Sequence, residues 1–408
     1  MTPKDSRYTR RGFLTTAATG LAALPLAGLT PTSVVGQEEA KEGEKKAGKI
    51  ITRKLGKTGF TLPIVSMGVM NANNPGVVQA SYEMGVRHFD TAAYYQYGRN
   101  EQMVGKVVSD LGIRDKVIIG TKVYTPAQRR GRTGEDAKQK FMSIFEASLK
   151  RLKMDYVDIL YMHDVSDPED VTDPAVHEIL AELKEQGRIR AAGVSTHSQM
   201  AAVINAAVKS GAYDVVLTSI NFTMADDTDL LKAIENASTQ GIGVVAMKTL
   251  AGGARWPNPE TREKYDSQTI AKAALKWVLR NPHVHTSIPG YDNHEHRRTD
   301  FSVAYDLEYT DEEQQFLSDN SIKLGMGFCR QCRGCLASCP QGVDVPNLMR
   351  THMYAAQYGN FHQARATLDD IPKDRGLAEC TSCKTCTAEC ANTVDIPRRI
   401  EELKLMYG

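Results

Sequence analysis

Residues 159–194 read ILYMHDVSDPEDVTDPAVHEILAELKEQGRIRAAGV, and this stretch contains a strand–helix–strand pattern. The apolar runs Ile159–Met162 and Ala191–Val194 are typical of buried strands, and residues 179–183 carry apolar side chains at helical spacing between them. Because neighbouring parallel strands need a helical crossover, the stretch predicts one βα repeat of an α/β fold.

The same alternation continues on both sides of this repeat. Six further apolar runs predict strands: Ile64–Met67, Arg87–Phe89, Val117–Gly120, Val215–Ile220, Val244–Met247 and Thr286–Ile288. Eight βα units in one domain predict a (β/α)8 TIM barrel. The alternative is an open doubly wound sheet, which the absence of a G-x-G-x-x-G motif after any strand disfavours. Residues 51–63, with a turn at Lys57-Thr58-Gly59, predict a small hairpin before the first strand.

Polar side chains follow four of the predicted strands directly. They are Asp90, Lys122, His163 and Ser195. In a barrel all four lie at the carboxyl-terminal face, where the active sites of such folds are built. Taken singly, His163 could be a satisfied core histidine and Lys122 half of a structural ion pair. As a set, the four predict a functional site.

Two cysteine runs with the same spacing stand near the carboxyl end. Residues 329–339 read CRQCRGCLASC and residues 380–390 read CTSCKTCTAEC. The spacing C-x2-C-x2-C-x3-C is that of bacterial ferredoxins and predicts two [4Fe–4S] clusters. Disulfides or zinc would not explain why the same spacing occurs twice. The predicted iron ligands are all eight cysteines of the chain: Cys329, Cys332, Cys335, Cys339, Cys380, Cys383, Cys386 and Cys390.

The sequence between and after the cysteine runs is mostly helical in pattern. Val343-Asp344-Val345-Pro346 and Val394-Asp395-Ile396-Pro397 repeat after the two runs, so the repeated unit is a cysteine run, a turn and a helix. This repeated unit resembles that of a small, mostly α-helical dicluster ferredoxin-like domain. The spacing leaves open which cysteine serves which cluster, because the fourth cysteine of a run can reach across to the other cluster.

The first residues are predicted to be a targeting segment. Thr9-Arg10-Arg11-Gly12-Phe13-Leu14 resembles a twin-arginine (Tat) export signal, and residues 1–36 are assigned to that signal peptide. An uncleaved anchor or a plain helical terminus is the alternative. We therefore expect an exported, periplasmic bacterial protein that uses the Tat translocase.

Composition divides the rest of the chain into three parts. Residues 37–49 form a charged linker, residues 50–322 the barrel, and residues 323–408 the ferredoxin-like domain. The net charge of +1 is spread without a basic stripe, so nucleic acid is not an expected partner.

Several motifs of the barrel resemble those of the aldo-keto reductases. They are FDTAAYYQYGRNE (89–101), SLKRL (148–152) with DYVD (155–158), KEQGRIRAAGVS (184–195) and IPG (288–290). The resemblance runs from about Arg53 to Phe301, and the whole chain resembles the branch of that family with a C-terminal ferredoxin-like domain.

The resemblance implies a catalytic tetrad of Asp90, Tyr95, Lys122 and His163. Tyr95 would be the general acid that quenches charge on a carbonyl oxygen, and Lys122 would lower its pKa. Asp90 would hold Lys122 in place, and His163 would orient the substrate through a hydrogen bond to its oxygen.

The nicotinamide positions depart from the family pattern. Thr196 stands where many members have Asn, Leu217 where many have Gln, and Met247 where many stack a Tyr on the ring. Residues 292–298 should open a helix whose amino terminus receives a cofactor phosphate. The expected cofactor-binding residues are Ser195, Thr196, Asn221, Lys248, Pro289, Gly290, Asn293 and Arg297.

The predicted function is an exported oxidoreductase that interconverts a small carbonyl compound and an alcohol by hydride transfer. It would hold NADP or NAD, a choice the sequence leaves open, and would exchange electrons with a redox partner protein through its clusters. The alternatives are a redox enzyme without nicotinamide and a non-catalytic electron carrier or redox sensor on a barrel scaffold.

Overall fold

The computed structural model describes residues 48–124, 135–252, 259–383 and 385–408. The predicted signal peptide, residues 1–36, and nearly all of the predicted linker lie outside these ranges. Within the described part, no helix is both long and apolar enough to cross a membrane.

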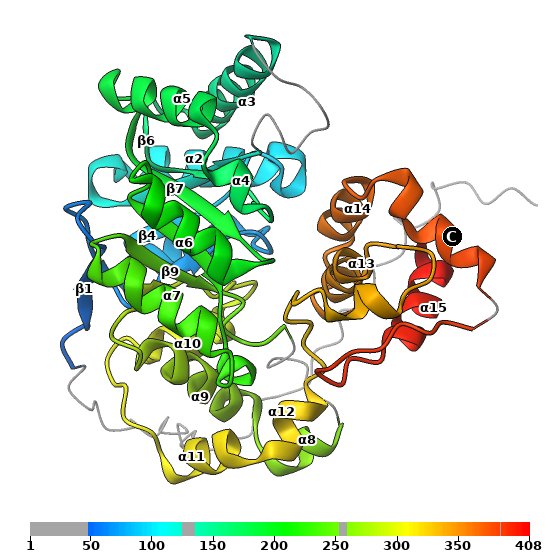
Figure 1. The fold of residues 1–408 in the computed structure, drawn as a ribbon. Helices are drawn as coiled ribbons and strands as arrows, with labels where there is room; N and C mark the ends of the chain where they lie inside the picture. The colour runs from blue at the N-terminus through cyan, green and yellow to red at the C-terminus, as the bar shows by residue number, and fades with distance from the viewer. Residues whose placement is uncertain (1–47, 125–134, 253–258, 384) are drawn as a thin grey trace, which may run out of the picture. The chain divides into compact units, whose positions relative to one another are not determined.

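Eight parallel strands form the barrel, and they follow one another in chain order around it (Figure 1). Parallel bridges from Val65 to Ser287 and from Gly68 to Gly290 join the last strand to the first and close the barrel. All eight predicted strands are present, so the prediction of a TIM barrel is confirmed. The strands are β3 (Met67–Gly68), β4 (His88–Asp90), β5 (Ile118–Val123), β6 (Val157–Met162), β7 (Ile189–Thr196), β8 (Val215–Ser219), β9 (Gly243–Met247) and β10 (Thr286–Ser287).

Helices cover the outside of the barrel (Figure 1). Several begin at an Asp whose side chain accepts a backbone N–H, as Asp173, Asp227 and Asp266 do, which fixes where the crossover turns into helix. The helices of this part are α1 (Pro75–Met84), α2 (Arg99–Leu111), α3 (Glu135–Leu152), α4 (Pro168–Val171), α5 (Pro174–Glu185), α6 (Met200–Ser210), α7 (Thr228–Thr239), α8 (Pro259–Lys264), α9 (Ser267–Leu279), α10 (His294–Ser302), α11 (Asp311–Ser318) and α12 (Asn320–Gly325).

The predicted hairpin is also present, as β1 (Thr52–Lys54) paired antiparallel with β2 (Thr61–Pro63). Leu55 and Phe60 of its turn and Leu62 of β2 belong to the apolar cluster that fills the barrel interior. Glycine at 241 lies against this turn, since the backbone N–H of Lys57 donates to its carbonyl. The hairpin therefore packs against the barrel core and leaves the opposite face for the site.

Two fully buried carboxylates tie the helices to the barrel. Glu101 of α2 accepts a bond from Arg151 Nε of α3 at 2.7 Å. Asp158 of β6 accepts bonds from Arg114 at 2.9 Å and from Arg190 at 2.7 Å. Because both carboxylates lie inside the family-like motifs, those motifs have a packing role in addition to any catalytic one.

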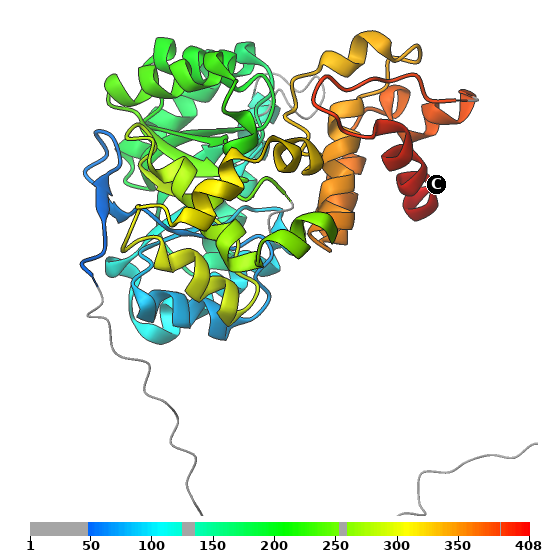
Figure 2. The ribbon, with the colours of Figure 1, turned by 90° about the horizontal axis from the view of Figure 1, so that it is seen from below.

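The segment from Phe328 to the end of the chain, called the C-terminal segment below, has its own helices (orange to red in Figure 2). They are α13 (Val345–His352), the π turn η6 (Met353–Gln357), α14 (Phe361–Asp369) and α15 (Ile396–Tyr407), with the 3-10 turns η5 (Gly334–Ser338), η7 (Lys373–Arg375) and η8 (Leu377–Ser382). The repeated V-D-(V/I)-P motif starts a helix each time. Asp344 caps α13 and Asp395 caps α15 through their side chains, and proline follows within the first turn.

The core of the C-terminal segment is small. Val343, Leu348, Ile396 and Leu403 belong to a cluster that packs against cysteine side chains. Met353, Tyr354 and Ala364 instead join the main apolar cluster of the barrel. The cysteines are thus part of the packing of this segment.

Candidate active site

The four residues of the predicted tetrad meet at the carboxyl ends of the strands. Lys122 Nζ forms an ion pair with the Asp90 carboxylate and donates to the carbonyl of Thr91 at 2.6 Å. The same Nζ lies 4.9 Å from the centre of the Tyr95 ring, and the Tyr95 and His163 rings are 5.9 Å apart, edge to face. The arrangement holds a hydroxyl, an ammonium and an imidazole around one end of a cleft.

Strand register explains why Asp90 and Lys122 meet. Asp90 of β4 pairs with Gly120 of β5, and Lys122 lies two residues further along, on the same face of its strand. Glycine leaves the necessary space at 120, since a Cβ there would lie 3.2 Å from the Tyr161 ring and 3.3 Å from Asp90 Oδ2.

Burial is the largest influence on the pKa values of Asp90, Tyr95 and Lys122. Burial lowers the pKa of Lys122 and raises the pKa of Asp90, while their mutual attraction opposes both shifts. The pKa of Tyr95 is raised well above its usual value, by burial first and then by the charges of Asp90 and Asp164, with Arg350 opposing. Burial thus outweighs the lowering of this pKa that was expected from Lys122, and that role of Lys122 stays a prediction. The hydroxyl is held in the protonated form that a proton donor requires.

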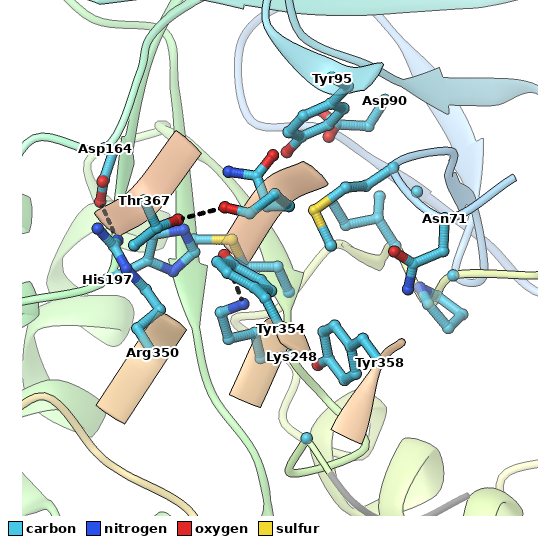
Figure 3. A pocket seen from close by; sticks show the side chains of 18 of the residues that line it. Asn71, Asp90, Tyr95, Asp164, His197, Lys248, Arg350, Tyr354, Tyr358 and Thr367 are labelled. Atoms are coloured by element: carbon cyan, nitrogen blue, oxygen red, sulfur yellow. Dashed lines mark hydrogen bonds and ion pairs between the residues drawn. The ribbon is translucent and has the colours of Figure 1, made fainter. Parts of the chain in front are cut away.

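One cleft joins these residues to the neighbouring strand ends and to the C-terminal segment (Figure 3). It encloses about 1170 Å³, including its open mouth. Three groups of residues line it: Asp90, Tyr95 and His163 of the tetrad; Met247, Lys248, Pro289 and Gly290 from the ends of β9 and β10; and Arg350, Tyr354, Tyr358 and Asp370 of the C-terminal segment.

Polar contacts attach the C-terminal segment to the barrel inside this cleft. Arg350 forms an ion pair of 2.6 Å with Asp164, and Tyr354 accepts a bond of 3.1 Å from Lys248 Nζ (Figure 3). Sequence reasoning missed Arg350, Tyr354 and Asp164. The sequence indicates only that residues 350 and 354 are four apart in a helical segment, so that they lie on one face. It does not indicate what that face contacts.

The cleft contains three of the predicted cofactor residues and omits three others. Lys248, Pro289 and Gly290 line it. Three others bond to backbone groups at the strand ends: Ser195 Oγ accepts from the N–H of Asp164 at 2.9 Å, Thr196 donates to the carbonyl of Ser198 at 2.9 Å, and Asn221 donates to the carbonyl of Lys248 at 3.2 Å.

The last two predicted cofactor residues lie on α10. Asn293 caps this helix by accepting from the N–H of His296 at 2.8 Å. Arg297 donates to the carbonyl of Ala80 at 2.6 Å and does not line the cleft. The helix starts where the sequence predicted, and both side chains are used to hold it.

The cleft is nonetheless compatible with a nicotinamide dinucleotide. It runs without interruption from Tyr95 past Lys248 to Pro289, Gly290 and Asp292, which precede the amino terminus of α10. Gly290 keeps the wall open, because a Cβ there would meet only the carbonyl oxygen of Gly68, at 3.7 Å. The residues present therefore fit an elongated ligand whose reactive end lies at the tetrad.

The cysteines gather around two separate pockets, four to each. One pocket is lined by Cys329, Cys332, Cys335 and Cys390, and the other by Cys339, Cys380, Cys383 and Cys386. The fourth cysteine of each run thus joins the first three of the other run, which the sequence left open. Four thiols around one pocket are the donor set of a [4Fe–4S] cluster.

The charges agree with this grouping. The pKa of Cys329 is raised to about 11, by burial first, with Cys390 and Cys332 adding to the shift and hydrogen bonds from Gln331 opposing it. Burial likewise raises the pKa of Cys380 to about 11, together with Cys339 and Cys386. Cluster insertion must therefore displace protons from these thiols. Among the described residues, no group of three or more His, Cys, Asp or Glu side chains is arranged to hold a single metal ion.

Comparisons with known proteins match this architecture. Residues 71–268 match the aldo/keto reductase family, and residues 328–395 match a 4Fe-4S dicluster domain. L-galactose dehydrogenase of Arabidopsis thaliana is 27% identical over 305 residues, which are 66% of this chain and 93% of that protein. Aldo-keto reductase YhdN of Bacillus subtilis is 33% identical over 121 residues, 30% of this chain and 36% of that protein.

Solved structures resemble the barrel as well. An aldo-keto reductase from Bacillus halodurans in its holo form has a TM-score of 0.53 at 23% identity and covers 66% of this chain and 95% of its own. A thermostable aldo-keto reductase bound to the inhibitor epalrestat has a TM-score of 0.54 at 24% identity, covering 66% and 98%. At this identity the likeness concerns the fold.

The chain therefore carries an aldo/keto reductase domain followed by a 4Fe-4S dicluster domain. It is an oxidoreductase of the aldo-keto reductase type.

Proposed function

We propose that this chain is an exported oxidoreductase that interconverts a small carbonyl compound and an alcohol with a bound nicotinamide, coupled to two [4Fe–4S] clusters. The observation that supports this most is the shared cleft: the predicted tetrad, the ends of β9 and β10, and the C-terminal segment all line it. A substrate site and a cluster domain that share one cavity are suited to a single redox reaction.

The tetrad residues have separate tasks in this proposal. When bound, nicotinamide supplies the hydride. Tyr95 donates its proton to the carbonyl oxygen as negative charge builds there, and takes it back in the reverse direction. Lys122, paired with Asp90, places a positive charge 4.9 Å from the Tyr95 ring and stabilises the tyrosinate that remains. His163, edge-on to Tyr95, orients the carbonyl oxygen.

The two cysteine pockets would each hold one [4Fe–4S] cluster. Such clusters supply one-electron transfer. Cys329 also lines a small cavity that includes Lys248 and Arg350, so the cysteine set of Cys329 and Cys390 adjoins the barrel site. The lining of the other pocket comes wholly from the C-terminal segment, and a redox partner protein would dock there.

Export through the twin-arginine route suits a protein whose clusters are assembled before transport. A freely dissociating nicotinamide would be lost outside the cytoplasm, so the proposal requires a cofactor, NADP or NAD, that stays bound. Replacing both Arg10 and Arg11 by Lys should retain the protein in the cytoplasmic fraction, whereas unchanged export would exclude the twin-arginine route.

The composition of the purified protein tests the central claim. The full chain, purified without oxygen from the exported fraction, is analysed for iron, sulfide and acid-released nicotinamide. About eight irons and one nicotinamide per chain support the proposal, with about four irons per cluster. Cys390→Ser and Cys339→Ser should each lower the iron content toward about four.

A second candidate is a redox enzyme that uses no nicotinamide. The observation that favours it is that the side chains of Ser195, Thr196, Asn221 and Arg297 are bonded to backbone groups and do not line the cleft. About eight irons with no nicotinamide would select this candidate instead.

A further inference from the structure

Three basic side chains from three separate elements meet in the cleft beside the tetrad. His197 directly follows β7, Lys248 directly follows β9, and Arg350 lies on α13 of the C-terminal segment. All three line the main cleft, and all three also line the small cavity that adjoins it toward Cys329. Figure 3 shows them grouped on the side of the cleft opposite Asn71.

Their hydrogen-bonding capacity is incompletely used. His197 Nδ1 and Arg350 Nε are buried and have no partner. Lys248 Nζ donates to the Tyr354 hydroxyl, and no carboxylate of the described residues lies within ion-pair distance of it. Asp164 is the acidic partner of Arg350 at 2.6 Å. Buried donors without partners are costly, so the arrangement is suited to a ligand that supplies acceptors.

The charges of the group also repel one another. The pKa of His197 is lowered well below its usual value by burial first and then by Lys248 and Arg350. The pKa of Lys248 is lowered to about 7, by burial first and then by Arg350, with Asp164 opposing. An anion between these groups would relieve the repulsion and supply the missing acceptors in one step.

We propose that His197, Lys248 and Arg350 bind the carboxylate of the substrate, so that the preferred substrates are small carbonyl compounds or alcohols that carry a carboxylate. The proposal rests on the proposed function, because it places the carbonyl of the same molecule at Tyr95 and His163. Those two residues line the same cleft as the basic group. Lysine and arginine donors are the usual partners of a carboxylate, and arginine can bind both of its oxygens.

This proposal assigns Lys248 to binding of the substrate. From the sequence, Lys248 had been expected to bind the cofactor. It also makes the C-terminal segment part of substrate recognition, because Arg350 and the hydroxyl of Tyr354 belong to it. Substrate selection and the cluster domain would then be linked through one helix face.

Binding of small unreactive probes tests the proposal without turnover. The full chain with its clusters is titrated in a calorimeter, without oxygen, with oxamate and with its neutral isostere oxamide. Oxamate should bind at least tenfold more tightly, because a charge-assisted contact is worth about a ten- to hundredfold change in affinity. Equal affinity for the two probes, or no binding of oxamate, would overturn the proposal.

Variants locate the binding site. Lys248→Met should weaken oxamate by about ten- to hundredfold and leave oxamide unchanged, and Lys248→Arg should restore part of the loss. Lys209→Met, on an exposed position of α6, is the matched control and should change neither probe. Iron content and thermal unfolding show that each variant is folded, and the comparison of probes on the natural chain stands without any variant.

A phosphate of the cofactor is the competing occupant. If inorganic pyrophosphate displaces oxamate and Lys248→Met weakens pyrophosphate more than oxamate, the group binds the cofactor and the proposal is wrong. A purified chain without nicotinamide would overturn the proposed function and leave the preference for oxamate intact, so the two failures are distinguishable.

Discussion

The barrel wall of the cleft and the wall supplied by the C-terminal segment are held in place by different forces. On the barrel side, strands with continuous apolar cores position Asp90 and Lys122, and buried ion pairs such as that of Glu101 and Arg151 fix the surrounding helices. On the other side, Met353, Tyr354 and Ala364 join the barrel's apolar cluster, while α13 and α15 contribute to a small apolar core that packs against half-buried cysteines. One wall is therefore stable through its own packing, while the other depends on what the cysteines bind.

Removal of iron should reveal most clearly the difference in stability between the two walls. When the clusters are destroyed by oxidation and the iron is chelated, we expect the amides of α13, α14 and α15 to lose their protection from hydrogen exchange. The amides of β5, β6 and β7 should keep theirs, because the barrel core contains no cluster. Hydrogen exchange read by mass spectrometry measures both regions at once. Equal protection before and after removal would show that the C-terminal segment folds independently of iron.

Loss of the Tyr95 hydroxyl should affect the chemistry of the barrel wall alone. In Tyr95→Phe we expect carbonyl turnover to fall by about 10²- to 10⁴-fold, the usual contribution of a positioned proton donor. The visible absorbance of the clusters should not change. Tyr97→Phe is the control, since Tyr97 lies in the same turn and is 67% exposed. Unchanged turnover of the Tyr95 variant would exclude the tetrad mechanism.

The buried ion pair of Glu101 and Arg151 allows the stability of the barrel itself to be tested. Arg151→Ala leaves Glu101 buried and without its cationic partner, which should lower the free energy of unfolding by about 3–5 kcal/mol. Lys106→Ala removes a partner from an exposed pair with Asp110 and should cost under about 1 kcal/mol. Chemical denaturation of both variants measures the difference. Similar losses in the two would mean that burial does not govern this pair.

We expect acid to destabilise the barrel through the buried side chain of His88. Burial, and then the charge of Lys122, lowers the pKa of His88 to about 3. The folded state therefore keeps His88 neutral while the unfolded state is protonated below about pH 6.5. His88 thus favours unfolding as the pH falls, by about 2 kcal/mol between pH 7 and pH 5.

A variant isolates this effect. Between pH 7 and pH 5, the free energy of unfolding of His88→Leu should fall by about 2 kcal/mol less than that of the natural chain. This difference does not depend on the stability of the variant at pH 7. His294→Gln, on an exposed residue of α10, should keep the natural slope. Denaturation midpoints at the two pH values give both slopes. If the stability of His88→Leu changed with pH as much as that of the natural chain, His88 would already be protonated in the folded state.

Local pattern accounts for what the sequence predicted well. The alternation of apolar runs identified all eight strands, because burial of a parallel strand requires a short continuous apolar run. The polar residue at each strand end could be assigned to one face of the barrel, since parallel strands share their carboxyl edge. The repeated Val-Asp-x-Pro motif likewise indicated where α13 and α15 begin.

Contacts between distant residues could not be predicted in this way. The sequence by itself determined the barrel and the cysteine runs, because these follow from spacing within single elements, whereas Tyr95 and its partners were predicted from the resemblance to the aldo-keto reductases. Only the tertiary structure decided that Cys390 joins Cys329 and that Arg350 pairs with Asp164, 186 positions away. Such pairs depend on how whole elements pack, and no local periodicity records that. The raised pKa of Tyr95 has the same origin, because burial is a property of the folded molecule.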